Sequence, residues 1–213
     1  ANASGPVVDP VAEEIARYIR EAGIERPAII GHSMGGSWAM MVAARHPGLA
    51  SRVMVVDMLP FIGAMFGPPG TTAESVRPVA EQIRQGFAAQ TGEARRRQIE
   101  QMIATMVRTE SFRPALVDQS LASDPRVSGQ AFYELIVTDL RPELARIDVP
   151  LTVLWVHPPS APFGPEQMEQ YYRLSYAGAP RAAVERIPDA WHFIMFDQPD
   201  AFHRELSEFL AGS

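Results

Sequence analysis

One serine in this sequence is placed where a nucleophile could be activated. Ser33 lies in the stretch Gly31-His32-Ser33-Met34-Gly35-Gly36, between the apolar run 28–30 and a helix-forming segment. A serine between two glycines on a tight strand-to-helix turn matches the G-x-S-x-G pattern, which exposes the hydroxyl at the carboxyl end of a parallel sheet. We expect Gly31 and Gly35 to leave room for this strained turn, and the Met34 backbone N–H to face a developing oxyanion.

A serine hydroxyl is a poor nucleophile until a base takes its proton, and five histidines could supply that base. His192 follows the last expected strand and precedes the terminal helix, so it can reach the carboxyl edge of the sheet. We therefore predict that His192 is the base. The other four lie inside the turn, at a helix end, in a proline-rich loop and on the terminal helix: His32, His46, His157 and His203.

The elements that must position these residues alternate between strand and helix. Short apolar runs predict strands at 28–30, 53–56, 151–156 and 182–187, which indicates a parallel α/β sheet. Helical patterns are expected at 10–22, 37–46, 73–90, 93–108, 112–121, 128–140, 166–176 and 200–210. Only helices are expected between the second and third strands. We predict a core made of residues 1–57 and 141–213, and a helical cap at 58–140.

Two of these helices are expected to bury one apolar face. The first would bury Val11, Ile15, Tyr18 and Ile19. The last would bury Phe202, Leu206, Phe209 and Leu210.

The order of serine turn, helical insert and late Trp191-His192-Phe193 resembles the α/β-hydrolase superfamily. The likeness is greatest to cap-bearing bacterial serine esterases, which carry the turn GHSMGG and an ending similar to GHF-x-M-x-E-Q-P-x-x-F. Residues 191–202 here read WHFIMFDQPDAF, and the resemblance extends from Val11 onward. It implies an α/β-hydrolase fold with a mostly parallel sheet, Ser33 as nucleophile, His192 as base and Met34 as oxyanion-hole donor. It implies no metal and no organic cofactor.

The third member of such a site, an acid that orients the base, departs from the usual pattern. The family often places an aspartate after the third strand seen here, but residues 156–165 contain no carboxylate. Some members carry the acid at the end of the strand that follows the serine turn, and Asp57 lies there. The resemblance therefore favours Asp57, with Asp189 and Glu166 as alternatives.

The beginning of the chain is a second departure. The superfamily has several strands before the serine turn, whereas about ten irregular residues precede the first helix here. We expect the chain to be the C-terminal portion of a cut or split hydrolase, lacking the first strands. A complementary N-terminal fragment would complete the sheet and supply a second oxyanion donor.

These residues indicate a carboxylesterase that acts on a small-molecule ester through an acyl-enzyme. Four residues are expected to line the substrate pocket: His32, Phe61, Trp191 and Phe193. The same three catalytic residues could instead support C–C bond hydrolysis, amide cleavage or perhydrolysis, because fold alone does not separate these reactions. A non-catalytic receptor that keeps the fold is the alternative from another class.

Composition excludes several other classes. The net charge of −6 argues against nucleic acid as a partner, and no apolar run is long enough to span a bilayer. All 19 basic residues are arginine, which removes Schiff-base and Ser–Lys chemistry and a Walker-type phosphate loop. The absence of cysteine removes thiolate nucleophiles and disulfides, and a soluble protein of this kind fits the cytoplasm and the periplasm equally well.

Overall fold

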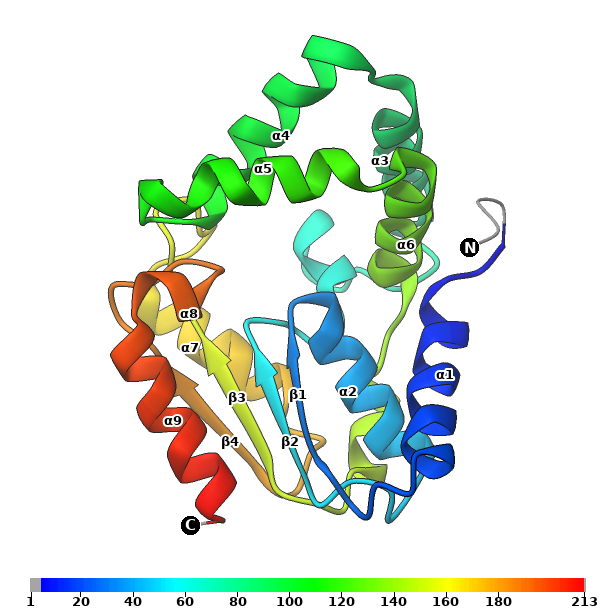
Figure 1. Ribbon diagram of the computed structural model, residues 1–213, viewed down its shortest axis with the longest axis vertical. Coiled ribbons are helices and arrows are strands. Elements are labelled where there is room, and N and C mark those ends of the chain that lie inside the picture. Colours follow the sequence, from blue (N-terminus) through cyan, green and yellow to red (C-terminus); the bar gives the residue numbers. More distant parts are fainter. Residues whose placement is uncertain (1–4, 213) are drawn as a thin grey trace. The chain divides into compact units, whose positions relative to one another are not determined.

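The chain forms two compact units in the computed structural model, which describes residues 5–212 (Figure 1). The sheet unit contains Val11–Pro60 and 140–212. The helical unit contains Phe61–Asp139 together with residues 5–10. The predicted helical insert spans residues 58–140, and that these helices form a cap on the core stays a prediction.

The ends of the predicted core differ from the observed grouping. Residues 1–4 and 213 lie outside the described residues. Residues 5–10 group with the helical unit because the N–H groups of Val7 and Val8 donate hydrogen bonds to the carboxylate of Glu134, at 2.9 and 2.7 Å.

The sheet unit is built on parallel strands that follow one another in sequence order. Within the described residues the order is β1-β2-β3-β4, and every neighbouring pair is parallel. The strands are β1 (Ala28–His32), β2 (Arg52–Val56), β3 (Leu151–Trp155) and β4 (Ala182–Arg186). Each coincides with a predicted apolar run, so the prediction of a parallel α/β sheet is confirmed.

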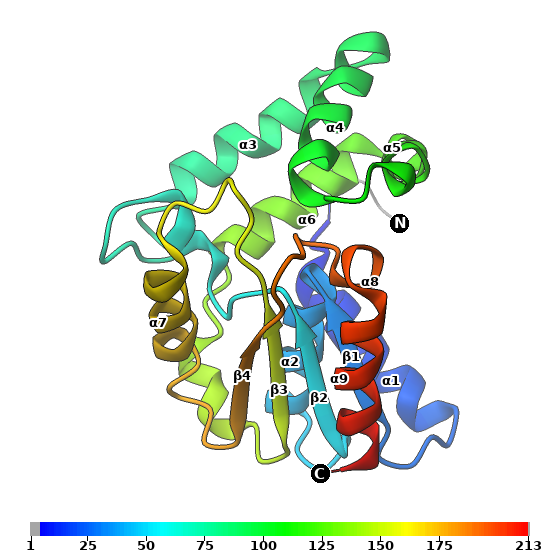
Figure 2. The ribbon, with the colours of Figure 1, turned by 90° about the vertical axis from the view of Figure 1, so that its left-hand side faces the viewer.

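Helices cover both faces of this sheet, which explains why β2 is apolar without alternation. On one face Val42 of α2 (Met34–Arg45) packs with Ala16 and Ile19 of α1 (Val8–Glu21) and with Ile29 of β1. On the other face β2 and β3 pack against α8 (Ile194–Asp197) and α9 (Pro199–Ala211). Figures 1 and 2 show α2 and α9 on opposite sides of the sheet.

Two predictions about buried helix faces were wrong. Tyr18 is 62% exposed, because α1 turns its small residues Ala12 and Ala16 inward and so approaches its neighbours closely. Leu210 is 55% exposed while Phe209 is buried. Leu210 points about 100° around the helix from Phe209, and this turns it away from the core that Phe209 packs into.

The serine turn depends on backbone contacts that exclude side chains. A Cβ atom at Gly31 would lie 2.0 Å from the Gly35 carbonyl oxygen, and one at Gly36 would lie 2.9 Å from Val55 Cγ1 of β2. These glycines allow α2 to start against the end of β1. A Cβ at Gly35 would meet nothing within 4 Å. The expectation that Gly35 is needed for space was therefore wrong, and Gly36 has that role.

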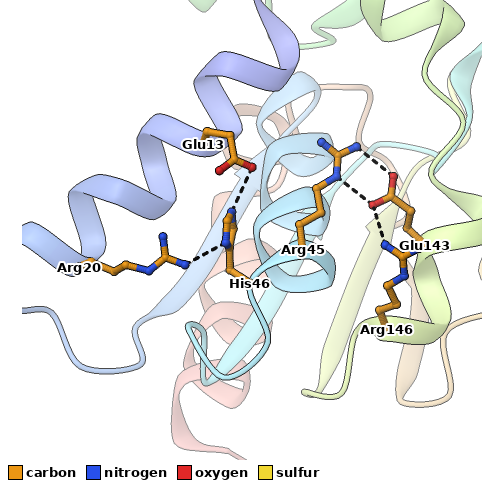
Figure 3. Close-up of polar contacts among 6 residues, drawn as sticks. All are labelled: Glu13, Arg20, Arg45, His46, Glu143 and Arg146. Atoms are coloured by element: carbon orange, nitrogen blue, oxygen red, sulfur yellow. Dashed lines mark hydrogen bonds and ion pairs between the residues drawn. The ribbon is translucent and has the colours of Figure 1, made fainter.

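An ion pair and two hydrogen bonds hold α2 at its C-terminal end (Figure 3). Arg45 donates from Nε and Nη2 to the two carboxylate oxygens of Glu143, both at 2.9 Å, and so links α2 to the 3-10 helix Arg141–Arg146. His46 accepts from Arg20 at Nδ1 (2.9 Å) and contacts Glu13 through Nε2 (3.2 Å), both on α1. The helix that carries the serine turn is thus bound to neighbours on two sides.

The helical unit consists of short helices around a small apolar core. Phe61, Val76, Ala80 and Ile136 form the buried centre of that core. The elements are α3 (Arg77–Ala89), α4 (Gly92–Met106), α5 (Arg113–Ala122), α6 (Pro125–Val137), and the 3-10 helices Ile62–Phe66 and Glu110–Phe112. No helix among residues 5–212 is long and apolar enough to cross a membrane.

We predict that alanine is destructive at Gly31 and harmless to folding at Gly35. Gly31→Ala should lower the free energy of unfolding by at least about 3 kcal/mol, because backbone atoms must move to admit the methyl group. Gly35→Ala, the matched control, should change it by less than about 1 kcal/mol, in the stabilising direction, because alanine favours the helix. Urea unfolding followed by circular dichroism measures both. Equal losses in the two variants would contradict this account of the turn.

Candidate active site

The predicted nucleophile and the predicted acid directly follow two neighbouring strands of the sheet. Ser33 follows β1, and its N–H donates to the carbonyl of Val56, the last residue of β2, at 2.9 Å. Asp57 comes next, and its N–H donates to the Leu154 carbonyl of β3 at 2.7 Å. Because the carboxyl ends of parallel strands meet at one edge, both residues lie where ligands bind in open α/β sheets.

Ser33 has the backbone strain expected of the turn. Its φ and ψ are 54° and −126°, a left-handed value of φ that non-glycine residues rarely adopt. Its hydroxyl makes no capping hydrogen bond with the first turn of α2, although serine is a favoured capping residue. Met34 is the first residue of α2, so its N–H belongs to the first turn, where helix N–H groups lack a partner within the helix.

The predicted acid, Asp57, and the predicted base, His192, are in direct contact. His192 Nδ1 donates to Asp57 Oδ2 at 2.7 Å, and the two side chains are 21% and 11% exposed. With Nδ1 carrying the proton, a neutral imidazole keeps its lone pair on Nε2 and can accept a proton there. Asp57 itself has φ 51°, so a second strained residue lies at this edge of the sheet.

His32 lies against His192. Its Nε2–H donates to the His192 backbone carbonyl at 2.8 Å, and the two ring centroids are 4.6 Å apart. Burial, and then the nearby His192, lower the pKa of His32 to about 4. A neutral His32 places no positive charge beside His192. Because Ser33 is the next residue, this contact brings the serine turn and the His192 loop together.

The other predicted pocket residues lie in two places. The Phe193 ring is 4.8 Å from that of His32 and 5.4 Å from that of His192. The Trp191 backbone N–H donates to Asp197 Oδ2 at 2.9 Å, which links the His192 loop to α8. Phe61 is 2% exposed in the core of the helical unit. That these residues line a substrate pocket stays a prediction.

The two alternative acids lie elsewhere on the sheet unit. Asp189 is exposed in the turn after β4, with φ 57°, and Glu166 is exposed in the first turn of α7 (Pro165–Ser175). The carboxylate that His192 Nδ1 contacts is that of Asp57.

One residue at this site was missed from the sequence. Tyr172 of α7 donates its hydroxyl to Asp57 Oδ1 at 3.1 Å. One turn later Tyr176 donates to the Met58 carbonyl at 2.6 Å. Two tyrosines four residues apart, on the helix after the strand that lacks an acid, are the signal that could have drawn attention to them. Among the described residues no group of three or more His, Asp or Glu side chains could hold a metal ion.

Comparison with known proteins agrees with this architecture. The family model for the alpha/beta hydrolase family matches residues 3–205. The chain therefore belongs to the alpha/beta hydrolase family, and the predicted superfamily and fold class are confirmed.

Individual relatives are distant. The chain is 23% identical over 212 residues to a mouse (Mus musculus) sn-1-specific diacylglycerol lipase, ABHD11, covering 95% of this chain and 65% of the relative. It is 39% identical over 57 residues to a putative esterase/lipase of Haemophilus influenzae, covering 27% and 20%. The chain thus spans less than two thirds of each of these two curated relatives. The esterase EaEST of Exiguobacterium antarcticum shares the fold, with a TM-score of 0.76, 17% identity, and 99% and 76% of the two chains covered.

We predict that His32 makes folding stability fall with acidity. The pKa of His32 is about 4 in the folded protein, against 6.5 for an unperturbed histidine such as that of an unfolded chain. The unfolded chain therefore binds the extra proton between these two values. Stability from this source is present above pH 6.5 and is lost as the pH falls to 4, by at most about 3 kcal/mol.

Urea unfolding of wild type and His32→Gln at several pH values measures this dependence. Glutamine can still donate to the His192 carbonyl but does not titrate. The stability of the variant should therefore fall less than that of the wild type between pH 6.5 and 4. His203→Gln, at an exposed position on α9, should keep the wild-type slope. If the stability of His32→Gln fell with pH as steeply as that of the wild type, His32 would not be the cause of the acid sensitivity.

Proposed function

We propose that this protein is a serine hydrolase that cleaves carboxylic esters through an acyl-enzyme intermediate. Ser33 is the nucleophile, His192 the general base and Asp57 the acid that orients His192. The observation that carries the proposal is the 2.7 Å hydrogen bond between Asp57 and His192, at the sheet edge where Ser33 occupies a strained turn.

The geometry supports a definite sequence of proton transfers. His192 Nε2 takes the proton of the Ser33 hydroxyl as its oxygen attacks the ester carbonyl carbon. The Met34 N–H stabilises the oxyanion that forms, and Asp57 stabilises the imidazolium. His192 then protonates the departing alcohol, leaving an acyl group on Ser33. Water, deprotonated by His192, attacks this acyl group, and collapse of the second tetrahedral intermediate returns the proton to Ser33 and releases the carboxylic acid.

Three comparisons favour an ester as the substrate. The mouse relative is named a diacylglycerol lipase, the Haemophilus influenzae relative a putative esterase/lipase, and the structural neighbour from Exiguobacterium antarcticum an esterase. The apolar side chains of Trp191 and Phe193 beside His192, with His32, are proposed to contact the substrate.

A fluorophosphonate probe, which reacts covalently with activated serines, tests the nucleophile. We expect the wild-type protein to be labelled, and Ser33→Ala to lose all labelling while keeping its circular dichroism spectrum. Ser37→Ala, which changes a buried serine one turn further along α2, is the control that should still be labelled. Absence of wild-type labelling would support the receptor-like alternative.

Further measurements, on unlabelled protein from the same preparation, separate the remaining parts of the proposal. Hydrolysis of p-nitrophenyl esters from acetate to palmitate tests the ester class, and labelling without turnover of any ester would favour C–C, amide or perhydrolase chemistry. We also propose that a complementary N-terminal segment pairs with β1, because β1 lies at an edge of the described sheet and its Ile30 is 43% exposed. The intact masses of all chains in the sample test for that segment.

Asp57→Asn tests the acid. We expect kcat to fall by about 1,000-fold or more with folding intact, because an asparagine cannot stabilise the imidazolium and favours the wrong tautomer of His192. Asp189→Asn is a matched control: it removes an alternative acid at another left-handed position, which asparagine tolerates, and should keep kcat within about twofold. A large fall in kcat in Asp189→Asn, with no fall in Asp57→Asn, would make Asp189 the acid in place of Asp57.

A further inference from the structure

The carboxylate of Asp57 is held from two directions. His192 Nδ1 donates to Oδ2 at 2.7 Å, and Tyr172 Oη donates to Oδ1 at 3.1 Å. The two donors come from different elements, the loop after β4 and helix α7. A carboxylate with one donor on each oxygen has little freedom to rotate about its terminal torsion.

Tyr172 is itself rigidly placed. Its ring stacks on Trp155, the last residue of β3, with centroids 5.0 Å apart and planes inclined by 20°. Both side chains are buried. One helical turn later Tyr176 Oη donates to the carbonyl of Met58 at 2.6 Å. Helix α7 therefore contacts Asp57 and the residue that follows it.

The direction of the Tyr172 hydrogen bond is fixed by chemistry. Burial raises the pKa of Tyr172 well above its usual value, and the negative charge of Asp57 raises it further. The hydroxyl therefore keeps its proton, and an ionised carboxylate offers only acceptors. Tyr172 therefore donates the hydrogen bond, and both Tyr172 and His192 stabilise the negative charge of Asp57.

We infer that Tyr172 is a positioning residue for the proposed active site: its hydroxyl orients the Asp57 carboxylate toward His192 and stabilises the negative charge of Asp57. The inference rests on the proposed function, because it concerns the acid of the same site. Trp155 acts with it as the surface on which the Tyr172 ring is held. Tyr172 touches neither the proposed nucleophile nor a reacting atom.

Removal of the Tyr172 hydroxyl has a consequence for pH dependence. Without one donor to Asp57, the Asp57–His192 pair binds its extra proton more tightly, and the acid limb of the activity profile moves to higher pH. The other titratable or charged groups around the pair are His32 on β1, Tyr176 at the end of α7 and Asp197 on α8. Arg186 of β4 lies 5.8 Å from the Trp155 ring. A change at Tyr172 alone leaves all of these in place.

Tyr172→Phe is the test, because phenylalanine keeps the ring stacked on Trp155 and removes only the hydroxyl. We expect kcat on a p-nitrophenyl ester to fall about tenfold with KM within about twofold, since a hydrogen bond to a charged group is lost. The acid limb should rise by about half a pH unit, the shift equivalent to about a threefold change in proton affinity. Tyr176→Phe also loses one buried hydroxyl hydrogen bond and should leave the acid limb in place.

A second readout does not require activity. The side-chain nitrogens of His192, assigned by their loss in His192→Gln, can be followed by NMR as the pH is changed. In Tyr172→Phe their titration midpoint should rise by about half a pH unit, and in Tyr176→Phe it should stay. An unmoved midpoint in Tyr172→Phe, or an equal rise in both variants, overturns the inference. A rise in a protein that neither binds the fluorophosphonate nor hydrolyses esters would uphold the positioning role and reject the proposed function.

Discussion

The backbones of Gly31 and Gly35 lie so close that no side chain can stand between them, and the site geometry depends on this approach. It lets α2 begin directly at the end of β1, which puts Ser33 at φ 54° and its N–H on the carbonyl of Val56. Since Asp57 follows Val56, the same contact places Ser33 near Asp57, the proposed acid. Strain of this kind persists only where the surroundings enforce it, and here the packing of Gly36 on β2 and the Arg45–Glu143 pair do so.

Much of the sheet unit could be predicted from the sequence, because its signals are local. The four parallel strands are short runs rich in apolar residues, and the G-x-S-x-G pattern specifies both neighbours of the turn. Helix positions were predicted as well, but not which way each helix faces. Tyr18 and Leu210 were assigned inward on apolar character alone. In the structure α1 buries Ala12, Ala16 and Ile19, and α9 buries Phe209, with Phe202 and Leu206 partly buried beside it.

The site was only partly predictable, because its remaining contacts join residues far apart in the chain. The contact between Asp57 and His192 spans 135 positions, and that between Tyr172 and Asp57 spans 115. Family resemblance directed attention to Asp57, but no local pattern connects a tyrosine in a helix with an aspartate after another strand. His32 is a similar case: its place in the serine motif does not reveal that its ring holds the His192 carbonyl, or that burial keeps it neutral.

Glu134 has a consequence for the order in which the protein can be completed. Its carboxylate accepts the N–H groups of Val7 and Val8, and so caps the start of α1 from 127 and 126 positions away. During synthesis on the ribosome, these amides emerge long before α6 exists to receive them. The first turn of α1 must remain bonded to water, or to a chaperone that covers it, until residue 134 has left the exit tunnel.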